Sequence, residues 1–160
     1  MEKKIKMGVE EDLEPVGIGG WLILVAIGHI LAPVTSLLNI YNIDDLRISA
    51  RMFDIEFPMM YFTVSKFGYI CIFILSIILL YLFFQKKKLY VPFAIGEIIF
   101  RMVLVVVLMF IGSSVEMMRA QLVMIAIFGL TSGAIWILYY KRSVRVKNTF
   151  VEEIKLTSAS

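Results

Sequence analysis

Apolar residues fill four long stretches of this chain, and short polar segments separate them. The stretches cover residues 19–39, 62–84, 89–111 and 122–140. An α-helix rises about 1.5 Å per residue, so about 20 apolar residues cross a hydrocarbon core of about 30 Å. The pattern therefore predicts an all-α fold, an integral membrane four-helix bundle.

The segment between the first two stretches has a helical periodicity of its own. Apolar residues recur at Leu46, Ala50, Phe53 and Phe57, while charged residues take other positions. This arrangement is typical of an amphipathic helix at a membrane interface. We predict a short outer-loop helix here, which lies on the outer leaflet or caps the bundle.

The fourth stretch carries one motif before its start and another in its interior. Ser113-Ser114-Val115-Glu116 has the spacing of a capping box, which predicts a helix start near Ser114. Gly129 and Gly133 form a small-xxx-small pattern that lets helix backbones approach closely. Packing within the chain is the favoured interpretation, and a protein partner or homodimer through these two glycines is the alternative.

Composition supports the membrane interpretation and limits the number of domains. Hydrophobic residues make up 60% of the chain and the mean hydropathy is +0.87, whereas about half of the residues of a soluble domain are apolar. The polar segments are each too short to build a core of their own. We expect one membrane domain over residues 1–160, with polar tails at 1–18 and 141–160.

The uneven distribution of basic residues predicts the orientation. Eleven of the sixteen Lys and Arg lie in the N-terminal tail (three), in Lys86–Lys88 (three) and from Lys141 onward (five). Four spans place these segments on one side of the membrane, which the positive-inside rule identifies as the cytoplasm. Orientation and lipid contact account for the net charge of +3, so we expect no nucleic-acid partner. The residues predicted to contact headgroups, including anionic ones, are Trp21, Lys141, Arg142, Arg145 and Lys147.

Three polar residues within the stretches are the candidates for function. Glu97 and Arg101 are four residues apart and share one helix face. A charge at the centre of a bilayer costs a few kcal/mol, so such residues face the bundle interior, pair with each other or line a wet cavity. His29 stands at about the same predicted depth as Glu97, and an unperturbed histidine titrates near neutral pH. The three could form one polar track.

Two interpretations of this track stay open. In the first, it is an ion or proton pathway, or a pocket in which Arg101 binds an anionic headgroup or a small solute. In the second, Glu97 and Arg101 neutralise each other, and His29 forms a hydrogen bond to another helix and fixes the packing.

Signatures of enzymes are missing from the sequence. It has no histidine cluster for zinc, no nucleophile motif and no phosphate-binding loop, so we expect neither an enzyme nor a cofactor. Cys71 is the only cysteine and cannot form an intramolecular disulfide. The methionine pairs Met59-Met60 and Met117-Met118 suggest a copper site only weakly, because adjacent residues on a helix diverge by about 100° and would not bind one ion together. We expect no metal site.

Both ends of the membrane region carry motifs that resemble a known family. They are Pro15–Leu24 (PVGIGGWLIL) with Pro33, and Trp136, Tyr139–Tyr140, Ser143 and Arg145–Phe150 (RVKNTF). These motifs resemble a bacterial family of small four-span membrane proteins of unknown function, and the middle stretches are similar to it in hydropathy. The resemblance implies the bacterial cytoplasmic (inner) membrane and no established activity.

These observations together predict a non-enzymatic multi-pass membrane protein. Its expected role is to bind a lipid or small solute within the membrane, or to act as an accessory subunit of a membrane assembly. The alternative is a small transporter or channel that uses His29, Glu97 and Arg101.

Overall fold

The computed structural model describes residues 18–150, without the side chains of Met117 and Met118, and predictions for residues 1–17 and 151–160 lie outside this part of the chain. The described residues form five helices: α1 (Trp21–Met52), α2 (Met59–Phe84), α3 (Tyr90–Gly112), α4 (Glu116–Arg142) and α5 (Val144–Phe150). The first four are long and apolar enough to cross a membrane. The predicted all-α membrane fold with four spans is confirmed.

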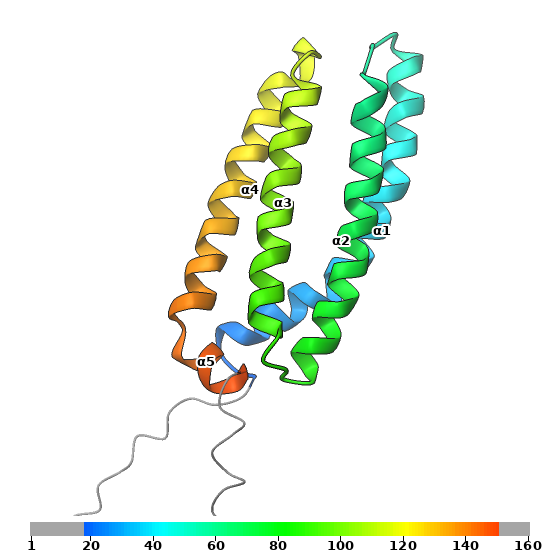
Figure 1. Cartoon of the computed structure of the whole chain (residues 1–160). Helices are drawn as coiled ribbons and strands as arrows, with labels where there is room; N and C mark the ends of the chain where they lie inside the picture. The colour runs from blue at the N-terminus through cyan, green and yellow to red at the C-terminus, as the bar shows by residue number, and fades with distance from the viewer. Residues whose placement is uncertain (1–17, 151–160) are drawn as a thin grey trace, which may run out of the picture.

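The helices run up and down, and their connections lie at two ends of the molecule (Figure 1). The start of α1, the α2–α3 connection and α5 lie at one end, which we call the α5 end. The α1–α2 connection and the α3–α4 turn lie at the other, which we call the loop end. α1 packs mainly on α2 and α3 on α4, and contacts between α2 and α3 join the two pairs.

α1 is strongly bent, and the sequence explains where. Pro33 lies inside the helix and has no N–H to donate to the carbonyl of His29 one turn earlier. The hydroxyls of Thr35 and Ser36 both donate to the carbonyl of Ala32, at 3.0 and 2.8 Å, a pattern that bends helices further. Figure 1 shows α1 crossing the lower part of the molecule obliquely and then turning upward beside α2.

The predicted outer-loop helix exists as the last part of α1 and is not a separate helix. No glycine or proline interrupts the chain between Pro33 and Pro58, so the helix continues to Met52. This part packs along α2, and its position relative to the membrane surface stays a prediction. Phe53 is 77% exposed and points away from that contact, whereas Ala50 is buried against it.

Some buried positions of α1 and α2 recur every seven residues. They are Ser36, Ile43 and Ala50 in α1 and Ser65, Ile72 and Leu79 in α2, and Ser36, Ala50 and Ser65 among them are small. Between apolar helices in lipid, close packing of small residues stabilises the contact, since burial from water contributes little there. Lys66 Nζ lies 2.8 Å from Asp44 Oδ2 and joins the same two helices near the loop end.

The capping box predicted before the fourth span does not form. Ser113 and Ser114 donate their hydroxyl hydrogens backward, to the carbonyls of Phe110 and Ile111 at 2.7 and 3.2 Å. The N-cap of α4 is Val115, and it makes no side-chain capping bond. Ser113 keeps helical backbone angles at the end of α3, so its hydroxyl satisfies a carbonyl of α3 and not an N–H of α4.

The two glycines of α4 face α3 of the same chain. A Cβ on Gly133 would lie 2.7 Å from Met102 Sδ, and one on Gly129 would lie 3.6 Å from Val105 Cγ1. The small-xxx-small spacing therefore serves packing within the chain, as the sequence favoured. A dimer through the same residues stays a prediction.

α5 was not predicted, because residues 141–160 were interpreted as a polar tail. It turns back under the bundle and buries Val146, Thr149 and Phe150. The ring of Phe150 packs on that of Tyr90, with centroids 4.4 Å apart. The guanidinium of Arg145 lies so close to Gly19 that a side chain on this glycine would overlap it. α5 thus brings together the N-terminal and C-terminal motifs noted in the sequence.

Candidate functional site

A partly open cavity of about 390 Å³ lies between α1, α3 and α4. It borders the oblique first half of α1, so the bend at Pro33 shapes one of its walls. The three polar residues singled out in the sequence all line it. The full lining is Leu24, Val25, Gly28, His29, Leu31, Ala32, Thr35, Glu97, Ile98, Arg101, Trp136 and Tyr140.

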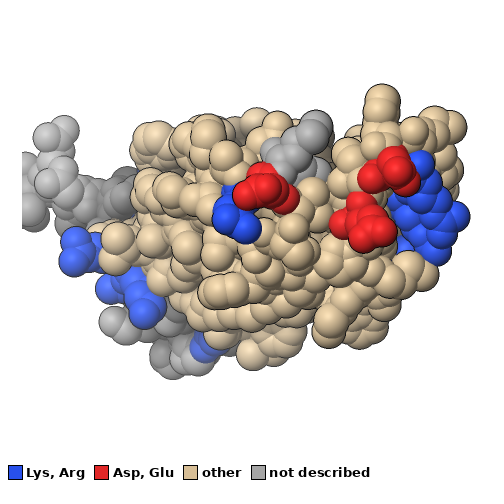
Figure 2. Space-filling model, turned by 90° about the horizontal axis from the view of Figure 1, so that it is seen from above, with Lys and Arg blue, Asp and Glu red and all other residues tan. Residues whose placement is uncertain are grey.

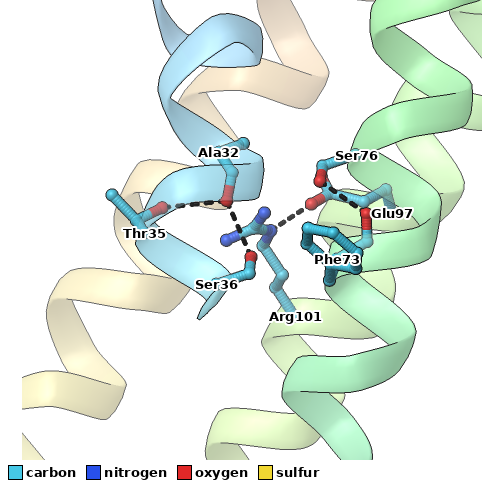
Figure 3. Close-up of polar contacts among 7 residues, drawn as sticks. All are labelled: Ala32, Thr35, Ser36, Phe73, Ser76, Glu97 and Arg101. Carbon is cyan, nitrogen blue, oxygen red and sulfur yellow. Dashed lines mark hydrogen bonds and ion pairs between the residues drawn. The ribbon is translucent and has the colours of Figure 1, made fainter. Parts of the chain in front are cut away.

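Glu97 and Arg101 form an ion pair on α3, as their spacing predicted. Arg101 Nε donates to Glu97 Oε1. The Glu97 side chain is 9% exposed, whereas that of Arg101 is 41% exposed. Figure 3 shows the guanidinium between Glu97 and the Ala32–Ser36 turn of α1. Arg101 is the central residue of the 23-residue helix α3, so the pair lies near mid-span.

The terminal nitrogens of Arg101 are spare hydrogen-bond donors of this pair. Within the described part of the chain they make no hydrogen bond, because the bond to Glu97 uses Nε alone. A guanidinium holds its N–H donors in one rigid plane and has no acceptor. Arg101 therefore offers donors to any oxygen that enters the cavity.

His29 belongs to a second group of hydrogen bonds in the same region. Its Nε2 lies 2.7 Å from Tyr90 Oη, which lies 2.7 Å from Tyr140 Oη. Tyr90 is the first residue of α3, about two turns from Glu97. The structure thus brings His29 to the cavity of Glu97 and Arg101, but its hydrogen bond joins it to the tyrosines.

The sequence did not point to Tyr90 and Tyr140 as functional candidates. The estimate that His29 and Glu97 share one depth assumed an upright first helix, whereas the oblique course of α1 brings His29 to the start of α3. The available signal was the position of the two tyrosines, one at the start of the third span and one at the end of the fourth.

A smaller cavity of about 250 Å³ adjoins the first one along α3 and α4. The two cavities share Ile98, Arg101 and Trp136. Gly129 and Gly133 line the smaller one, where both glycines also lie against side chains of α3. Arg101 therefore borders both cavities.

The two ends of the molecule differ in charge. At the α5 end the described residues include seven basic and no acidic side chains: Lys86, Lys87, Lys88, Lys141, Arg142, Arg145 and Lys147. The loop end mixes both signs, and Figure 2 shows red and blue side chains there. The charged residues at this end include Arg47, Arg51, Asp54, Glu56, Glu116 and Arg119.

The residues predicted to contact lipid headgroups lie at the α5 end. Trp21 is 67% exposed at the start of α1. Lys141, Arg142 and Lys147 are exposed, and Arg145 is half-buried beside Gly19. Within the described residues no three His, Cys, Asp or Glu side chains are grouped as metal ligands.

Fold and cavity define a four-span membrane protein with a partly open cavity between α1, α3 and α4 that reaches a charged pair. The chain matches the model of a family described as protein of unknown function (DUF2569) over residues 15–151, and it belongs to that family. The match includes both terminal motifs and the spans between them. Neither a curated protein nor a solved structure matches the chain.

Proposed function

We propose that this protein binds an amphipathic molecule, a lipid or a lipid-like small solute, in the cavity between α1, α3 and α4. One observation carries the proposal: a cavity of about 390 Å³ with mostly apolar walls reaches the spare donors of Arg101. Apolar walls with a few convergent polar groups are typical of small-molecule sites.

Access from the bilayer supports this function. Leu24 and Leu31 stand at the cavity and are 55% and 52% exposed. In a membrane, exposed apolar side chains face lipid tails, so a hydrophobic molecule can enter sideways without crossing water. The interior charge pair fits the same role, because charged residues in membrane spans mark ligand or ion sites.

A matched pair of glycine variants tests the proposal. A Cβ on Gly28 or on Gly96 meets no atom within 4 Å, but only Gly28 lines the cavity. Gly28→Leu should fill the cavity without disturbing the fold, and Gly96→Leu is the control. We expect native mass spectrometry to find a bound amphiphile on the parent and on Gly96→Leu, and to find it lost from Gly28→Leu. Equal retention by all three proteins would mean that the bound molecules lie outside the cavity.

Transport is the second candidate, and a specific arrangement favours it. His29, Tyr90 and Tyr140 form a hydrogen-bonded chain on the α5 side of the cavity, and Glu97 and Arg101 continue the polar groups to mid-span. Such chains of groups are used for proton relay in membranes. If the protein carries protons, liposomes containing it should show a proton flux that falls in Glu97→Gln; equal fluxes with and without protein would remove this candidate.

We infer that the protein sits in a bacterial inner membrane with the α5 end in the cytoplasm. The support is the basic α5 end, which among the described residues carries no acidic side chain. Basic residues next to an anionic leaflet each contribute about 1 kcal/mol of attraction, so the same residues would bind the inner leaflet.

A further inference from the structure

We propose that the molecule bound in the cavity is an uncharged amphiphile whose flat head carries carbonyl oxygens, as the head of a membrane quinone does. This inference rests on the proposed function and specifies its ligand. It depends on the charge balance of the site, on its depth and on the chemistry of its walls.

The charge balance favours an uncharged head. Glu97 already neutralises Arg101, since the two form an ion pair within one helix. An anionic head on Arg101 would leave the site with a net negative charge near mid-span, which costs a few kcal/mol or more in a bilayer. A neutral acceptor oxygen uses the spare donors of Arg101 and adds no charge.

The depth of the site agrees with this choice. Arg101 is the central residue of α3, far from both ends of the span. Phospholipid headgroups stay at the interface, because charge is costly to bury. A head that reaches Arg101 must therefore be one that the interior of the bilayer tolerates, such as a carbonyl-bearing ring on a hydrocarbon tail.

The walls of the cavity suit a flat ring. His29, Trp136 and Tyr140 contribute aromatic rings to the lining. Aromatic rings pack on flat π-systems in offset or edge-to-face arrangements. Arg101 and Trp136 carry N–H groups that can only donate, and carbonyl oxygens are the matching acceptors.

The adjoining cavity provides room for a tail. Its lining from Met102 to Gly133 is mostly apolar, and it meets the first cavity at Arg101 and Trp136. A head placed at Arg101 therefore has a path for its hydrocarbon chain between α3 and α4.

Fluorescence of Trp136 tests the inference directly. The chain has two tryptophans, so Trp21→Phe leaves Trp136, at the junction of the two cavities, as the only one. The full chain in phosphatidylcholine nanodiscs is titrated with a short-tailed benzoquinone, which quenches tryptophan emission on contact. We expect saturable quenching that oleate, an anionic single-chain amphiphile, does not reverse.

Two variants in the Trp21→Phe background distinguish binding of the quinone in the cavity from its general partitioning into the bilayer. Replacing Glu97 and Arg101 together by Gln keeps the site neutral and removes the charged donor, so quinone affinity should fall about tenfold or more. Gly28→Leu should abolish saturable quenching, and it keeps the test valid if the double variant does not fold. Arg119→Gln, whose side chain binds the Ser113 carbonyl far from both cavities, is the control and should bind as the parent does.

The outcomes distinguish this inference from the function on which it rests. Linear quenching that is equal in all variants would overturn the proposal that the ligand is a quinone. Displacement of the quinone by oleate at equal concentration would overturn it too. If the quinone fails while the parent still holds a phospholipid that Gly28→Leu loses, the binding function survives with a different ligand. If no molecule depends on Gly28, both proposals fail.

Discussion

At the scale of single residues, the pairing of Glu97 with Arg101 decides what the interior of this protein can do. The two side chains are one helical turn apart, so each of these charges has its counter-charge on the same helix, α3. Glu97 is buried while the outer edge of Arg101 stays accessible. The carboxylate therefore fixes the guanidinium in place, and the guanidinium keeps donors for another molecule.

A double-mutant cycle measures how strongly the pair is coupled. Arg101→Leu leaves Glu97 buried without its partner, and removal of one member of a buried pair costs about 3–5 kcal/mol. Replacing both residues by Leu removes both charges and should restore most of the free energy of unfolding. Unfolding in detergent, followed by circular dichroism, gives the values for Glu97→Leu, Arg101→Leu and the double variant. A loss of stability in the double variant equal to the sum of the two single losses would show that the residues act independently.

The sequence showed this pair but not the contacts of His29, for a physical reason. Spacing of four residues fixes the relative position of Glu97 and Arg101 inside any α-helix. The partner of His29 depends on the course of α1 relative to α3, which the bend at Pro33 sets. Its bond to Tyr90 joins two helices, as the packing interpretation of this histidine expected.

At the scale of helices, hydropathy predicted the four spans but not where helices continue beyond them. α1 extends to Met52 because no glycine or proline breaks the helix after Pro33, although the residues become more polar. α5 was missed because only Val146 and Phe150, four residues apart, show that one face of this basic segment is apolar. The capping box failed because the same serines can also bond to the preceding helix.

Helix packing around the smaller cavity gives a prediction with an internal control. A side chain at Gly133 meets Met102 and Ile98 on α3, so Gly133→Leu should force α3 and α4 apart. Overpacking of this kind costs about 1–3 kcal/mol. A Cβ on Gly96 of α3 meets no atom within 4 Å, so Gly96→Leu should leave the midpoint of thermal unfolding unchanged or raise it. A loss of stability in Gly96→Leu as large as in Gly133→Leu would contradict the α3–α4 contact.

At the scale of the whole molecule, the bend of α1 and the uneven distribution of charge make the α5 end and the loop end different. At the α5 end the helices converge on one buried cluster that includes Leu22, Phe83, Tyr90 and Phe150. At the loop end, Ile43, Ala50 and Phe62 form a separate small cluster between α1 and α2. The cavity shares Val25 and Tyr140 with the larger cluster and extends from there to Arg101 near mid-span.

Orientation is the property of the whole molecule that the charge asymmetry predicts. Translocation of short loops rich in Lys and Arg is disfavoured, so the α5 end should stay in the cytoplasm. Single cysteines in a Cys71→Ala background test this with a maleimide that does not cross membranes. Lys87→Cys lies in the α2–α3 connection, and Phe53→Cys is 77% exposed at the loop end. Intact cells should label Phe53→Cys at once and Lys87→Cys only after lysis; the reverse order of labelling would invert the topology and place the basic end outside.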